Sequence, residues 1–372
     1  MSNKWKIAMF GQKHVLSREG GVEIVVKELS TRMAALGHEV TCYDRRSAHV
    51  SGEKIADVSE FQSVRIRSVW TVEKKGLAAM TSSLSAALRT AFGKYDIVHI
   101  HAEGPAAMCW IPKLGGKKVI VTVHGLDWAR AKWGGFATRY IKWGEKQAVR
   151  RADEIIVLSR GVQKYFSETY GRKTIFIPNG VTQPAIQPAE EISSRWGLKK
   201  GSYVLFLGRI VPEKGLRYLV EAWKGIRTDL KLVIAGGSSD TDSFVKELRG
   251  MADERVIFTG FQQGRVLEEL YSNAYLYVLP SDLEGMPLSL LEAMSYGNAC
   301  LVSDIPECAE VVEDKAAVFR HGNVDDLRRV LQELLDDPGR VGQLRSEASD
   351  FIVNKYSWDD VVARTLAVYG SN

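Results

Sequence analysis

The sequence predicts an α/β protein with two Rossmann-like domains, and three observations lead to this fold class. Short β-rich runs alternate with segments of helical periodicity from end to end, which is the pattern of βαβ units. The strand candidates are apolar throughout, as strands are when helices cover both faces of a parallel sheet. The chain has 372 residues, of which 45% are hydrophobic and 26% charged, and this is enough for two separate cores.

The strand candidates fall into two groups, separated by a stretch without periodicity. The first group comprises Trp5–Phe10, Glu39–Tyr43, Val64–Val69, Asp96–Ile100, Lys118–Val123, Glu154–Leu158 and Thr174–Ile177. The second group comprises Tyr203–Leu207, Leu230–Ala235, Val256–Thr259, Leu276–Leu279, Ala299–Ser303 and Ala317–Phe319. A helix that ends at Gly37 is predicted between the first two strands. Its expected buried face comprises Val22, Val25, Leu29, Met33 and Leu36.

The boundary between the two domains is predicted near residues 180–200. Pro178–Asn179–Gly180 is followed by a proline-spaced stretch with little periodicity, and a new strand begins at Tyr203. We therefore assign residues 1–180 to an N-terminal domain and residues 181–354 to a C-terminal domain. Apolar residues at helical spacing between Ser357 and Tyr369 predict a final helix within 355–372.

Composition excludes several classes of protein. No run of 18 or more apolar residues occurs, so we expect no membrane-spanning helix, and the first residues lead into a strand without a secretory pattern. Cys42, Cys109, Cys300 and Cys308 form no C-x-x-C pair and are expected to pack as small apolar side chains in a reducing cytoplasm. Residues 1–180 contain 29 Lys and Arg against 16 Asp and Glu, whereas the remainder contains 21 against 29. We therefore expect the first domain to meet an anionic partner.

Two clusters in the first domain lie where α/β sheets bind ligands, beyond strand ends and at helix N-termini. Gly20–Gly21 opens the first helix, so its backbone amides can approach an anion. The alternative is a flexible loop tip. His124 ends a buried strand in front of Gly125. It is either a functional histidine at the sheet edge or a hydrogen-bonded side chain at a strand end.

A third cluster follows the first strand of the second domain, in the segment Gly208–Arg209–Ile–Val–Pro–Glu–Lys214–Gly215. A guanidinium and an ammonium five residues apart, on a loop bracketed by glycines, can converge on a diphosphate. The alternative is a solvated basic loop. The acidic balance of this domain favours the functional interpretation.

The fourth and most specific cluster follows the strand Leu276–Leu279. Pro287 is expected in the first turn of a helix, which leaves the amides around Gly285–Leu288 available to an anion. Glu284 then lies in the loop before the helix, and Glu292 lies more than a turn into it. Because carboxylates accept bidentate hydrogen bonds from diols, one can reach a sugar hydroxyl and the other a ribose. Two solvated glutamates are the alternative.

These motifs resemble those of the family 4 glycosyltransferases, whose GT-B fold has two Rossmann-like domains facing each other across a cleft. The resemblance covers nearly the whole chain, from Gly20–Gly21 to the tail at Tyr356–Ser357–Trp358. It rests most on the spacing of Glu284 and Glu292 together with the loop after Gly208. The segment from His124 to Gly180 is also similar to the bacterial rhamnosyltransferases of surface-polysaccharide assembly.

The resemblance implies a role for each matching position. The N-terminal domain would bind the acceptor, the C-terminal domain would bind the nucleotide-sugar donor, and the tail helix would cross back onto the N-terminal domain. Arg209 and Lys214 would bind the donor diphosphate, Glu284 would contact the transferred sugar, and Glu292 the ribose. His124 would lie near the sugar, and Gly20–Gly21 would shape the phosphate and acceptor end. The donor-binding set is completed by Asn179, Gly285, Met286, Pro287 and Leu288.

The predicted reaction moves a sugar, with rhamnose as one candidate, from a nucleotide-diphosphate sugar to an acceptor hydroxyl with retention of configuration. The histidines are too scattered for a metal cluster, and we expect no metal or other cofactor, because Arg209 and Lys214 neutralise the leaving diphosphate. One alternative is a nucleotide-sugar 2-epimerase on the same fold. The other is a non-enzymatic nucleic-acid-binding protein, but we expect no nucleic-acid partner because no binding motif is present.

A further prediction concerns the stretch from Trp128 to Trp143, which interleaves aromatic residues with cations directly after His124. A helix with an aromatic core face and a solvated basic face is one interpretation. The basic first domain, and the lipid-linked acceptors that the resemblance implies, favour another. We predict a cytoplasmic protein attached peripherally to the anionic inner face of the membrane. Its acceptor would be a polyprenyl-diphosphate-linked or other glycan.

Overall fold

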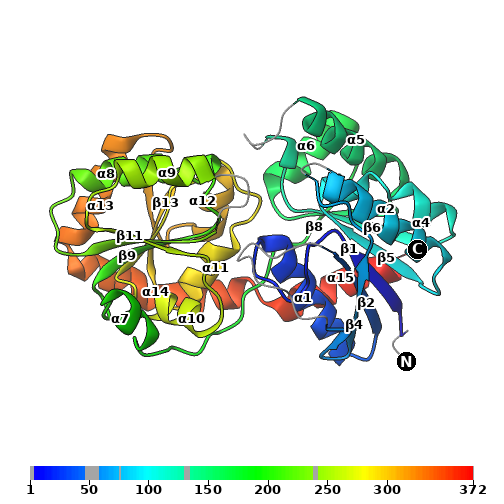
Figure 1. The fold of residues 1–372 in the computed structure, drawn as a ribbon, viewed down its shortest axis with the longest axis horizontal. Helices are drawn as coiled ribbons and strands as arrows, with labels where there is room; N and C mark the ends of the chain where they lie inside the picture. The colour runs from blue at the N-terminus through cyan, green and yellow to red at the C-terminus, as the bar shows by residue number, and fades with distance from the viewer. Residues whose placement is uncertain (1–3, 47–57, 75–76, 130–134, 238–241, 372) are drawn as a thin grey trace. The chain divides into compact units, whose positions relative to one another are not determined.

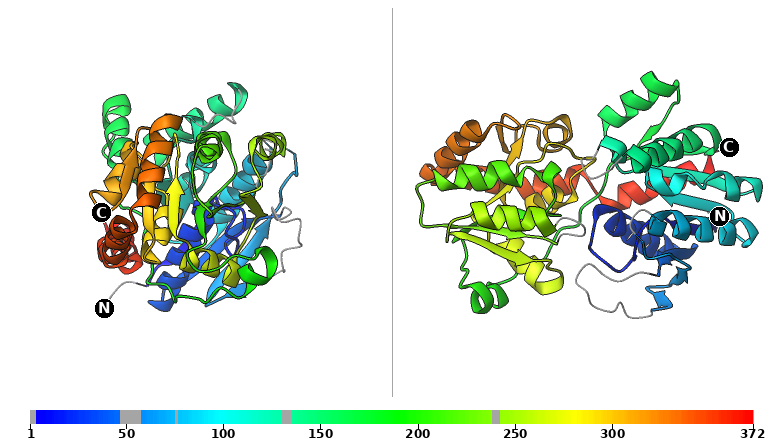
Figure 2. Two further views of the ribbon diagram at one scale, coloured as in Figure 1. Left: turned by 90° about the vertical axis from the view of Figure 1, so that its left-hand side faces the viewer. Right: turned by 45° about the horizontal axis from the view of Figure 1, so that its top comes forward.

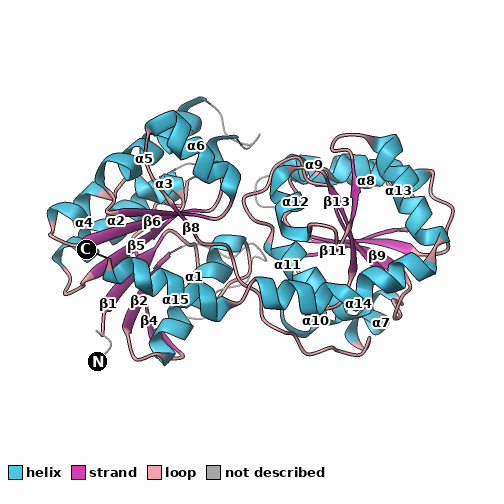
Figure 3. Cartoon of the chain, turned by 180° about the vertical axis from the view of Figure 1, so that it is seen from behind, coloured by secondary structure: helices cyan, strands magenta, loops and turns pink. Residues whose placement is uncertain are grey.

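The computed structural model describes residues 4–46, 58–74, 77–129, 135–237 and 242–371, and the chain divides into two compact units. Unit 1 comprises Met1–Asn179 and Trp358–Asn372, and unit 2 comprises Gly180–Ser357. Each unit has one sheet with helices on both faces (Figures 1 and 3). The predicted α/β class with two Rossmann-like domains is therefore confirmed.

Unit 1 contains an eight-stranded sheet in the order β3-β4-β2-β1-β5-β6-β7-β8, parallel except for the β3–β4 pair. Its strands are β1 (Lys6–Phe10), β2 (Glu39–Arg45), β3 (Glu60–Phe61), β4 (Val64–Val69), β5 (Ile97–His101), β6 (Lys118–Val123), β7 (Glu154–Val157) and β8 (Ile175–Phe176). Its helices are α1 (Gly21–Ala35), α2 (Leu77–Phe92), α3 (Glu103–Ala106), α4 (Trp110–Leu114), η1 (Asp127–Ala129), α5 (Gly135–Arg151), α6 (Arg160–Tyr170) and α15 (Trp358–Gly370). Helices α1 and α15 lie on one face, and α2 to α5 lie on the other (Figures 1 and 3).

Unit 2 contains a six-stranded parallel sheet in the order β11-β10-β9-β12-β13-β14. Its strands are β9 (Tyr203–Leu207), β10 (Lys231–Ala235), β11 (Val256–Gly260), β12 (Leu276–Leu279), β13 (Ala299–Ser303) and β14 (Ala317–Phe319). Its helices are α7 (Glu191–Trp196), η2 (Pro212–Lys214), α8 (Leu216–Lys224), α9 (Asp242–Met251), α10 (Gly264–Asn273), α11 (Leu288–Ser295), α12 (Pro306–Val312), α13 (Val324–Asp336) and α14 (Pro338–Lys355). Helices α8, α9 and α13 cover one face, and α10, α11 and α14 cover the other (Figure 1).

The tail helix α15 belongs to unit 1, where it packs beside α1 (Figure 2). Arg32 Nη1 lies 2.6 Å from Asp359 Oδ1. The Tyr369 hydroxyl lies 2.7 Å from His99 Nδ1, in the interior of the unit. The end of the chain therefore completes the layer of unit 1 that α1 begins.

All four cysteines are buried and free of disulfide bonds, as the sequence analysis expected. Burial raises the pKa of the Cys109 thiol to about 12, and it also raises the pKa values of Cys42, Cys300 and Cys308. These thiols remain protonated at neutral pH and pack as small apolar groups.

The structure corrects two local predictions. Helix α1 ends at Ala35, and Leu36 is 64% exposed rather than part of the buried face. The stretch predicted to lack periodicity contains α7, which Glu269 anchors by accepting hydrogen bonds from the backbone amides of Glu190 and Ile192 at 3.0 and 3.1 Å. A helix this short gives no periodic signal, so tertiary contacts decide it.

Candidate functional site

Two of the predicted clusters in unit 2 meet at one edge of its sheet. Strands β9 and β12 are parallel neighbours, so the loops that follow them leave from the same carboxyl end. The loop after β9 carries Arg209 and Lys214, and the loop after β12 carries Glu284. Lys214 Nζ lies 2.5 Å from Glu284 Oε1. The fold therefore joins two groups that are 70 residues apart in the chain.

Backbone contacts hold these two loops together. The Asp282 amide donates a hydrogen bond to the Glu213 carbonyl oxygen at 2.9 Å. Gly215 has a φ of +68°, and a Cβ atom on it would lie 1.9 Å from the Pro280 carbonyl oxygen. Only glycine fits both this conformation and this approach. Gly215 therefore allows the turn after Lys214 to lie against the loop that carries Glu284.

The Lys214–Glu284 ion pair is shielded from solvent. The two side chains are 12% and 8% exposed. Ser281 Oγ donates a further hydrogen bond to Glu284 Oε1 at 2.6 Å, and Ser303 Oγ donates to the Ser281 carbonyl oxygen at 2.6 Å. A lysine ammonium has three donors, so Lys214 can keep this contact and still donate to a ligand. The pair suits two adjacent ligand groups, one anionic and one hydroxylic.

Glu292 lies on α11, a helix whose other residues are largely in the core. Its carboxylate is half-buried, and the Tyr271 hydroxyl donates a hydrogen bond to Oε2 at 3.1 Å. Tyr271 comes from α10 and stacks on Tyr296 with ring centroids 5.2 Å apart. Four neighbours of Glu292 are fully buried: Leu290, Leu291, Ala293 and Met294. The sequence analysis missed Tyr271, because its contact depends on helix packing and no local motif marks it.

Helix α11 begins one residue later than predicted. Pro287 is not in the first turn but precedes it as the N-cap residue, with φ of −77° and ψ of 96°. In this extended conformation its carbonyl oxygen accepts hydrogen bonds from the amides of Leu290 and Leu291. Gly285 and Met286 form the turn before it, and Leu288 is the first helical residue. The four residues Gly285 to Leu288 thus lie at the start of α11, next to the loop that carries Glu284.

Arg209 is half-buried on a loop that rests against a second glycine turn. The Gly208 amide donates to the Ala235 carbonyl oxygen at 3.0 Å. A Cβ atom on Gly236 would lie 1.8 Å from the Gly208 carbonyl oxygen. The turn after β10 therefore supports the backbone next to Arg209. A Gly-Gly pair directly after a strand was the signal that could have identified this turn from the sequence.

In unit 1, His124 ends a row of three buried histidines. His99 and His101 lie on β5, next to β6, and His124 follows β6. His101 Nδ1 lies 3.1 Å from His124 Nε2, while His99 contacts Thr122 and Tyr369 at 2.7 Å each. Burial lowers the pKa of His99 to about 3 and that of His101 well below its ordinary value. Both rings are neutral, and His101 orients His124. His99 and His101 were not predicted as site residues. Their spacing of two residues, which places both side chains on one face of a strand, was visible in the sequence.

Two buried carboxyl groups anchor the loop that follows His124. Glu103 Oε2 accepts a hydrogen bond from the Asp127 amide at 2.8 Å. Burial, together with the charges of Asp127 and Glu145, raises the pKa of Glu103 well above its ordinary value. Glu145 accepts hydrogen bonds from Trp128, Tyr165 and Tyr170. These contacts were not predicted, because they join residues from four separate segments.

Gly20 and Gly21 lie at the start of α1 as predicted, but their backbone does not require glycine. Gly20 is the N-cap residue with an extended φ of −160°. A Cβ atom on Gly20 would instead lie 2.8 Å from Glu23 Oε2. Glu23 is 6% exposed, and Glu19 is 9% exposed and pairs with Lys13 at 2.8 Å. Carboxylates at this helix N-terminus favour a hydroxylic ligand over an anionic one.

The aromatic and basic stretch is only partly described. Residues 130–134, which include Arg130, Lys132 and Trp133, lie outside the described residues. On α5, Phe136 is 69% and Trp143 42% exposed, so the interpretation of this helix as one with an aromatic core face is wrong for these two residues. Four cations of α5 are also exposed: Arg139, Lys142, Lys146 and Arg150. In the part of the chain that the structure describes, no helix is long and apolar enough to cross a membrane.

Two predicted features remain to be placed. Asn179 is 2% exposed and is the last residue of unit 1 before the chain enters unit 2. The sequence also contains an Asp-x-Asp spacing at Asp240–Thr241–Asp242 that the expectation of metal independence did not weigh. Asp240 and Thr241 lie outside the described residues. Among those that the structure does describe, no group of three or more His, Cys, Asp or Glu is arranged to hold a metal ion.

Two family models match the chain in consecutive segments. The family model described as "Glycosyltransferase Family 4" matches residues 19–183, and the one described as "Glycosyl transferases group 1" matches residues 188–357. The chain is 30% identical over 270 residues to an Escherichia coli UDP-Gal:alpha-D-GlcNAc-diphosphoundecaprenol alpha-1,3-galactosyltransferase, covering 66% of this chain and 67% of that protein. It is 24% identical over 401 aligned positions to an uncharacterized glycosyltransferase of Methanocaldococcus jannaschii, covering 98% and 97%.

Solved structures show the same fold. Sucrose-phosphate synthase from Thermosynechococcus elongatus superposes with a TM-score of 0.81 at 20% identity, covering 98% of each chain. HepE from Anabaena, in complex with UDP and glucose, superposes with a TM-score of 0.82 at 16% identity, covering 99% of this chain and 100% of that one. The sheet-edge motifs, the matches to both family models and the relatives agree, and the chain belongs to the family 4 glycosyltransferases with the GT-B fold.

Proposed function

We propose that this glycosyltransferase moves a hexosyl group from a nucleotide-diphosphate sugar to a hydroxyl of a lipid-linked glycan in cell-surface polysaccharide synthesis, with retention of configuration. The observation that carries the proposal is the contact of Lys214 with Glu284 at the carboxyl end of the unit 2 sheet. This contact offers a cation for a phosphate and a carboxylate for a sugar hydroxyl side by side. Rhamnose is one candidate sugar, on the resemblance of the segment from His124 to Gly180.

In this proposal, unit 2 holds the donor by charge. Arg209 and Lys214 bind the diphosphate and stabilise the negative charge that develops on it as the glycosidic bond breaks. Glu284 accepts a hydrogen bond from a sugar hydroxyl, and Glu292, oriented by Tyr271, accepts from the ribose. The amides at Gly285–Leu288, at the start of α11, add to the positive potential. Since the two cations supply this charge, we propose that the reaction needs no metal ion.

In this proposal, unit 1 contributes groups that orient the substrates and do not supply charge. His124, fixed by its hydrogen bond to neutral His101, lies near the transferred sugar, and Asn179 completes the donor pocket. The Gly20–Gly21 loop shapes the acceptor end. The buried carboxylates of Glu19 and Glu23 beside it suit hydroxyl donors of a glycan.

We propose that the acceptor is presented at the anionic inner face of the membrane, to which this cytoplasmic protein attaches peripherally. Two features support this proposal: the exposed aromatics and cations of α5, and the diphosphoundecaprenol acceptor named for the Escherichia coli relative. Aromatic rings favour the headgroup level, and anionic lipids attract exposed cations. Vesicle flotation at low and high salt tests the attachment, and failure to float with anionic vesicles at low salt would contradict it.

The test of the donor is a thermal-shift panel of rhamnosyl, glucosyl and galactosyl nucleotides. A true donor at 100 times its dissociation constant stabilises the folded state by about 2.7 kcal/mol. Incubating that donor with and without lipid-linked glycan then distinguishes transfer from epimerisation. Transfer requires the acceptor, whereas an isomerised sugar from donor alone would establish the 2-epimerase. A gel shift with nucleic acid and no response to any nucleotide sugar would establish the nucleic-acid-binding alternative.

A further inference from the structure

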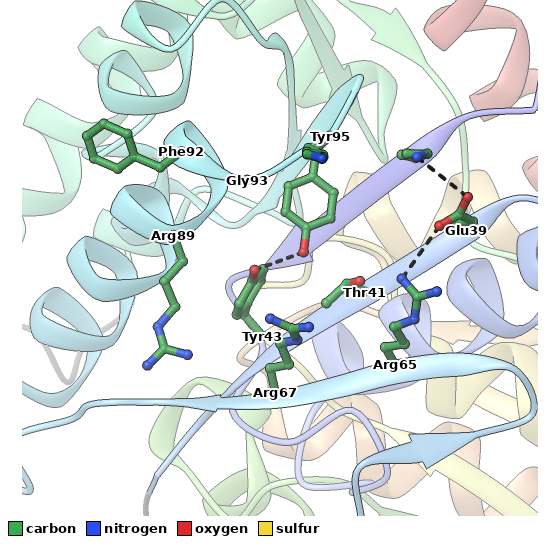
Figure 4. A pocket seen from close by; sticks show the side chains of 11 residues that line it. Glu39, Thr41, Tyr43, Arg65, Arg67, Arg89, Phe92, Gly93 and Tyr95 are labelled. Atoms are coloured by element: carbon green, nitrogen blue, oxygen red, sulfur yellow. Dashed lines mark hydrogen bonds and ion pairs between the residues drawn. The ribbon is translucent and has the colours of Figure 1, made fainter.

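A basic pocket of about 520 Å³ lies in unit 1, on the face of the sheet that α2 partly covers (Figure 4). This volume is in the range of small-molecule sites. Strands β2 and β4, the end of α2 and the loop before β5 supply its walls. The cations that line it are Lys6, Arg65, Arg67, Arg89 and Lys94.

The pocket lies on strands β1, β2 and β4, none of which is a neighbour of β6, the strand before His124. Lys6 and Glu39 are the first residues of β1 and β2, whereas His124 follows the last residue of β6. All these strands are parallel, so Lys6 and Glu39 are at the amino-terminal edge and His124 is at the carboxyl-terminal edge. Tyr43 and Arg67 extend the pocket along β2 and β4 to the level of Phe10, the last residue of β1. None of the residues that line the pocket is assigned to the proposed transfer reaction.

Sheet register explains why the arginines converge. Thr41 pairs with Arg65, and Tyr43 pairs with Arg67. Side chains alternate along a strand, so these four residues project from the same face of the sheet. In Figure 4, Tyr43 lies between Arg67 and Arg89, which comes from α2. Two arginines from distant segments therefore flank one tyrosine.

The charges in the pocket are not balanced. Glu39 is the single carboxylate in its lining, and its oxygens lie 3.8 Å from Lys6 Nζ and 3.5 Å from Arg65 Nη1. Arg67, Arg89 and Lys94 form no ion pair with any residue that the structure describes. Gathering like charges costs free energy unless an anion compensates it. Guanidinium groups are suited to phosphate because they can donate two parallel hydrogen bonds.

The floor of the pocket is rigid and carries hydroxyl groups. The hydroxyls of Tyr43 and Tyr95 lie 2.9 Å apart, and their rings meet edge to face with centroids 6.3 Å apart. Phe92, which also lines the pocket, is 88% exposed. Its ring offers an apolar contact to the organic part of a ligand. The site thus combines hydrogen-bonded hydroxyl groups, cations that form no ion pair with a described residue, and an apolar rim.

We propose that this pocket binds a phosphate group with at least two negative charges, a phosphomonoester or a diphosphate, at a site distinct from the donor site. A lipid headgroup and a soluble phosphorylated molecule share this chemistry. The proposal does not depend on the identity of the donor or the acceptor.

Calorimetry of the full chain with inorganic pyrophosphate tests the site. Arg67→Gln/Arg89→Gln is expected to weaken a pyrophosphate-binding component at least tenfold. Arg209→Gln/Lys214→Gln should leave that component intact, and so should Lys199→Gln/Lys200→Gln, a pair of exposed lysines in the loop before β9. Both pocket arginines are exposed, so their glutamine variants should fold, and circular dichroism checks this. Arg67→Lys keeps the charge but loses the two parallel hydrogen-bond donors of the guanidinium group, so this variant should bind pyrophosphate with intermediate affinity. Equal binding by wild type and Arg67→Gln/Arg89→Gln would overturn the proposal.

Two further arms identify the source of the phosphate. Glycerol 3-phosphate is titrated as a soluble phosphomonoester, and phosphatidylcholine vesicles containing phosphatidic acid are used in flotation. Loss of flotation in Arg67→Gln/Arg89→Gln, with retention in Lys199→Gln/Lys200→Gln, identifies a lipid headgroup. Loss of glycerol 3-phosphate binding in the pocket variant, with unchanged flotation, identifies a soluble ligand. Loss of pyrophosphate binding alone identifies a diphosphate as the ligand. If the pocket variant changes neither pyrophosphate binding nor either arm, the site is not a phosphate site.

Discussion

Unit 2 places an ammonium against a carboxylate at the carboxyl end of its sheet, whereas unit 1 places the imidazoles of His101 and His124 in hydrogen-bond contact at the same end of its own. In unit 2, Lys214 and Glu284 form an ion pair, and a backbone hydrogen bond from Asp282 to Glu213 holds their two loops together. In unit 1, His101 is hydrogen-bonded to His124, and His99 is hydrogen-bonded to Thr122 and Tyr369. Burial lowers the pKa values of His99 and His101. One fold class therefore supports two electrostatic designs at equivalent edges.

This difference suggests a division of work between the units. Charge on short glycine-bounded loops suits a group that gains negative charge in the reaction, such as a departing diphosphate. Neutral, interlocked side chains suit orientation of a hydroxylic substrate, for which position matters more than charge. The following variants test whether the two edges really differ in this way.

The largest effect is expected at the charged edge. Lys214→Gln should lower turnover about 100- to 1,000-fold, or about 2.7–4 kcal/mol, because the leaving diphosphate loses a preorganised cation. Glutamine is chosen because its amide can still donate to Glu284. Lys214→Ala is avoided, because removing one partner of a buried ion pair costs about 3–5 kcal/mol of stability. Lys224→Gln, on the exposed surface of α8, is the control in initial-rate assays.

The same assay tests metal independence. EDTA should leave turnover of the wild type unchanged. Strict dependence on a divalent cation, or full activity of Lys214→Gln, would contradict the proposed role of the two cations. It would also direct attention to the Asp240–Thr241–Asp242 spacing.

The next effect is expected in the packing of unit 1. A Cβ atom on Gly144 would lie 2.0 Å from the Glu103 carbonyl oxygen, so Gly144→Ala should push α5 away from α3. Overpacking of this kind costs about 1–3 kcal/mol, measured by urea unfolding. Gly135→Ala on the same helix, where no described atom lies within 4 Å of the added Cβ, should be nearly neutral. Equal stability of the two variants would show that this close approach is not required.

A pH effect should distinguish the buried carboxyls of the two units. The folded state raises the pKa of Glu103, chiefly by burial. Its contribution to stability is thus present below the unfolded pKa of about 4.3 and is lost as the pH rises through the folded pKa. Glu103→Gln imitates the protonated form and should raise the free energy of unfolding at pH 7 by about 1–3 kcal/mol. Urea unfolding across pH 4–8 measures the free energy of unfolding of both proteins. It should be higher for Glu103→Gln at pH 7, and it should change less with pH than in the wild type.

Asp326 in unit 2 provides the comparison of opposite sign. A hydrogen bond from the Arg320 amide, followed by one from Arg329, lowers its pKa. The contribution of Asp326 to the stability of the folded state is present above its unfolded pKa, and it is lost as the pH falls through its folded pKa. Asp326→Asn should therefore destabilise the protein at neutral pH and change little in acid. The same sign of effect for Glu103→Gln and Asp326→Asn would break the contrast between the units.

The smallest effect separates the two glutamates of unit 2. Glu292→Gln should weaken binding of the free nucleoside diphosphate and of the nucleotide sugar alike, by about tenfold, because it loses a charged acceptor. Glu284→Gln should weaken binding of the nucleotide sugar much more than that of the free nucleotide. Calorimetry with both ligands measures the difference. Equal losses in both variants would refute the separate assignments to sugar and ribose.

Most of the fold was predictable, because its elements are long enough to show their own pattern. All described strands except β3 were predicted. Most of them have the apolar run that a covered sheet requires, and β4 alternates valine and isoleucine with Arg65 and Arg67. Strand β3 has two residues, Glu60 and Phe61, and its antiparallel pairing with β4 leaves no pattern to detect. Leu36 was misplaced because periodicity cannot tell the last helical turn from the cap beyond it.

The sequence by itself determined the fold class and the loops that carry Arg209, Lys214 and Glu284, because parallel strands send their following loops to one edge of the sheet. Only the tertiary structure decided that Lys214 contacts Glu284, that His101 orients His124, and that Arg67 and Arg89 flank Tyr43. These pairs come from segments far apart in the chain, so their contacts depend on strand order, register and helix packing. Local patterns of residues carry information about period and charge, but not about which neighbour a side chain will meet.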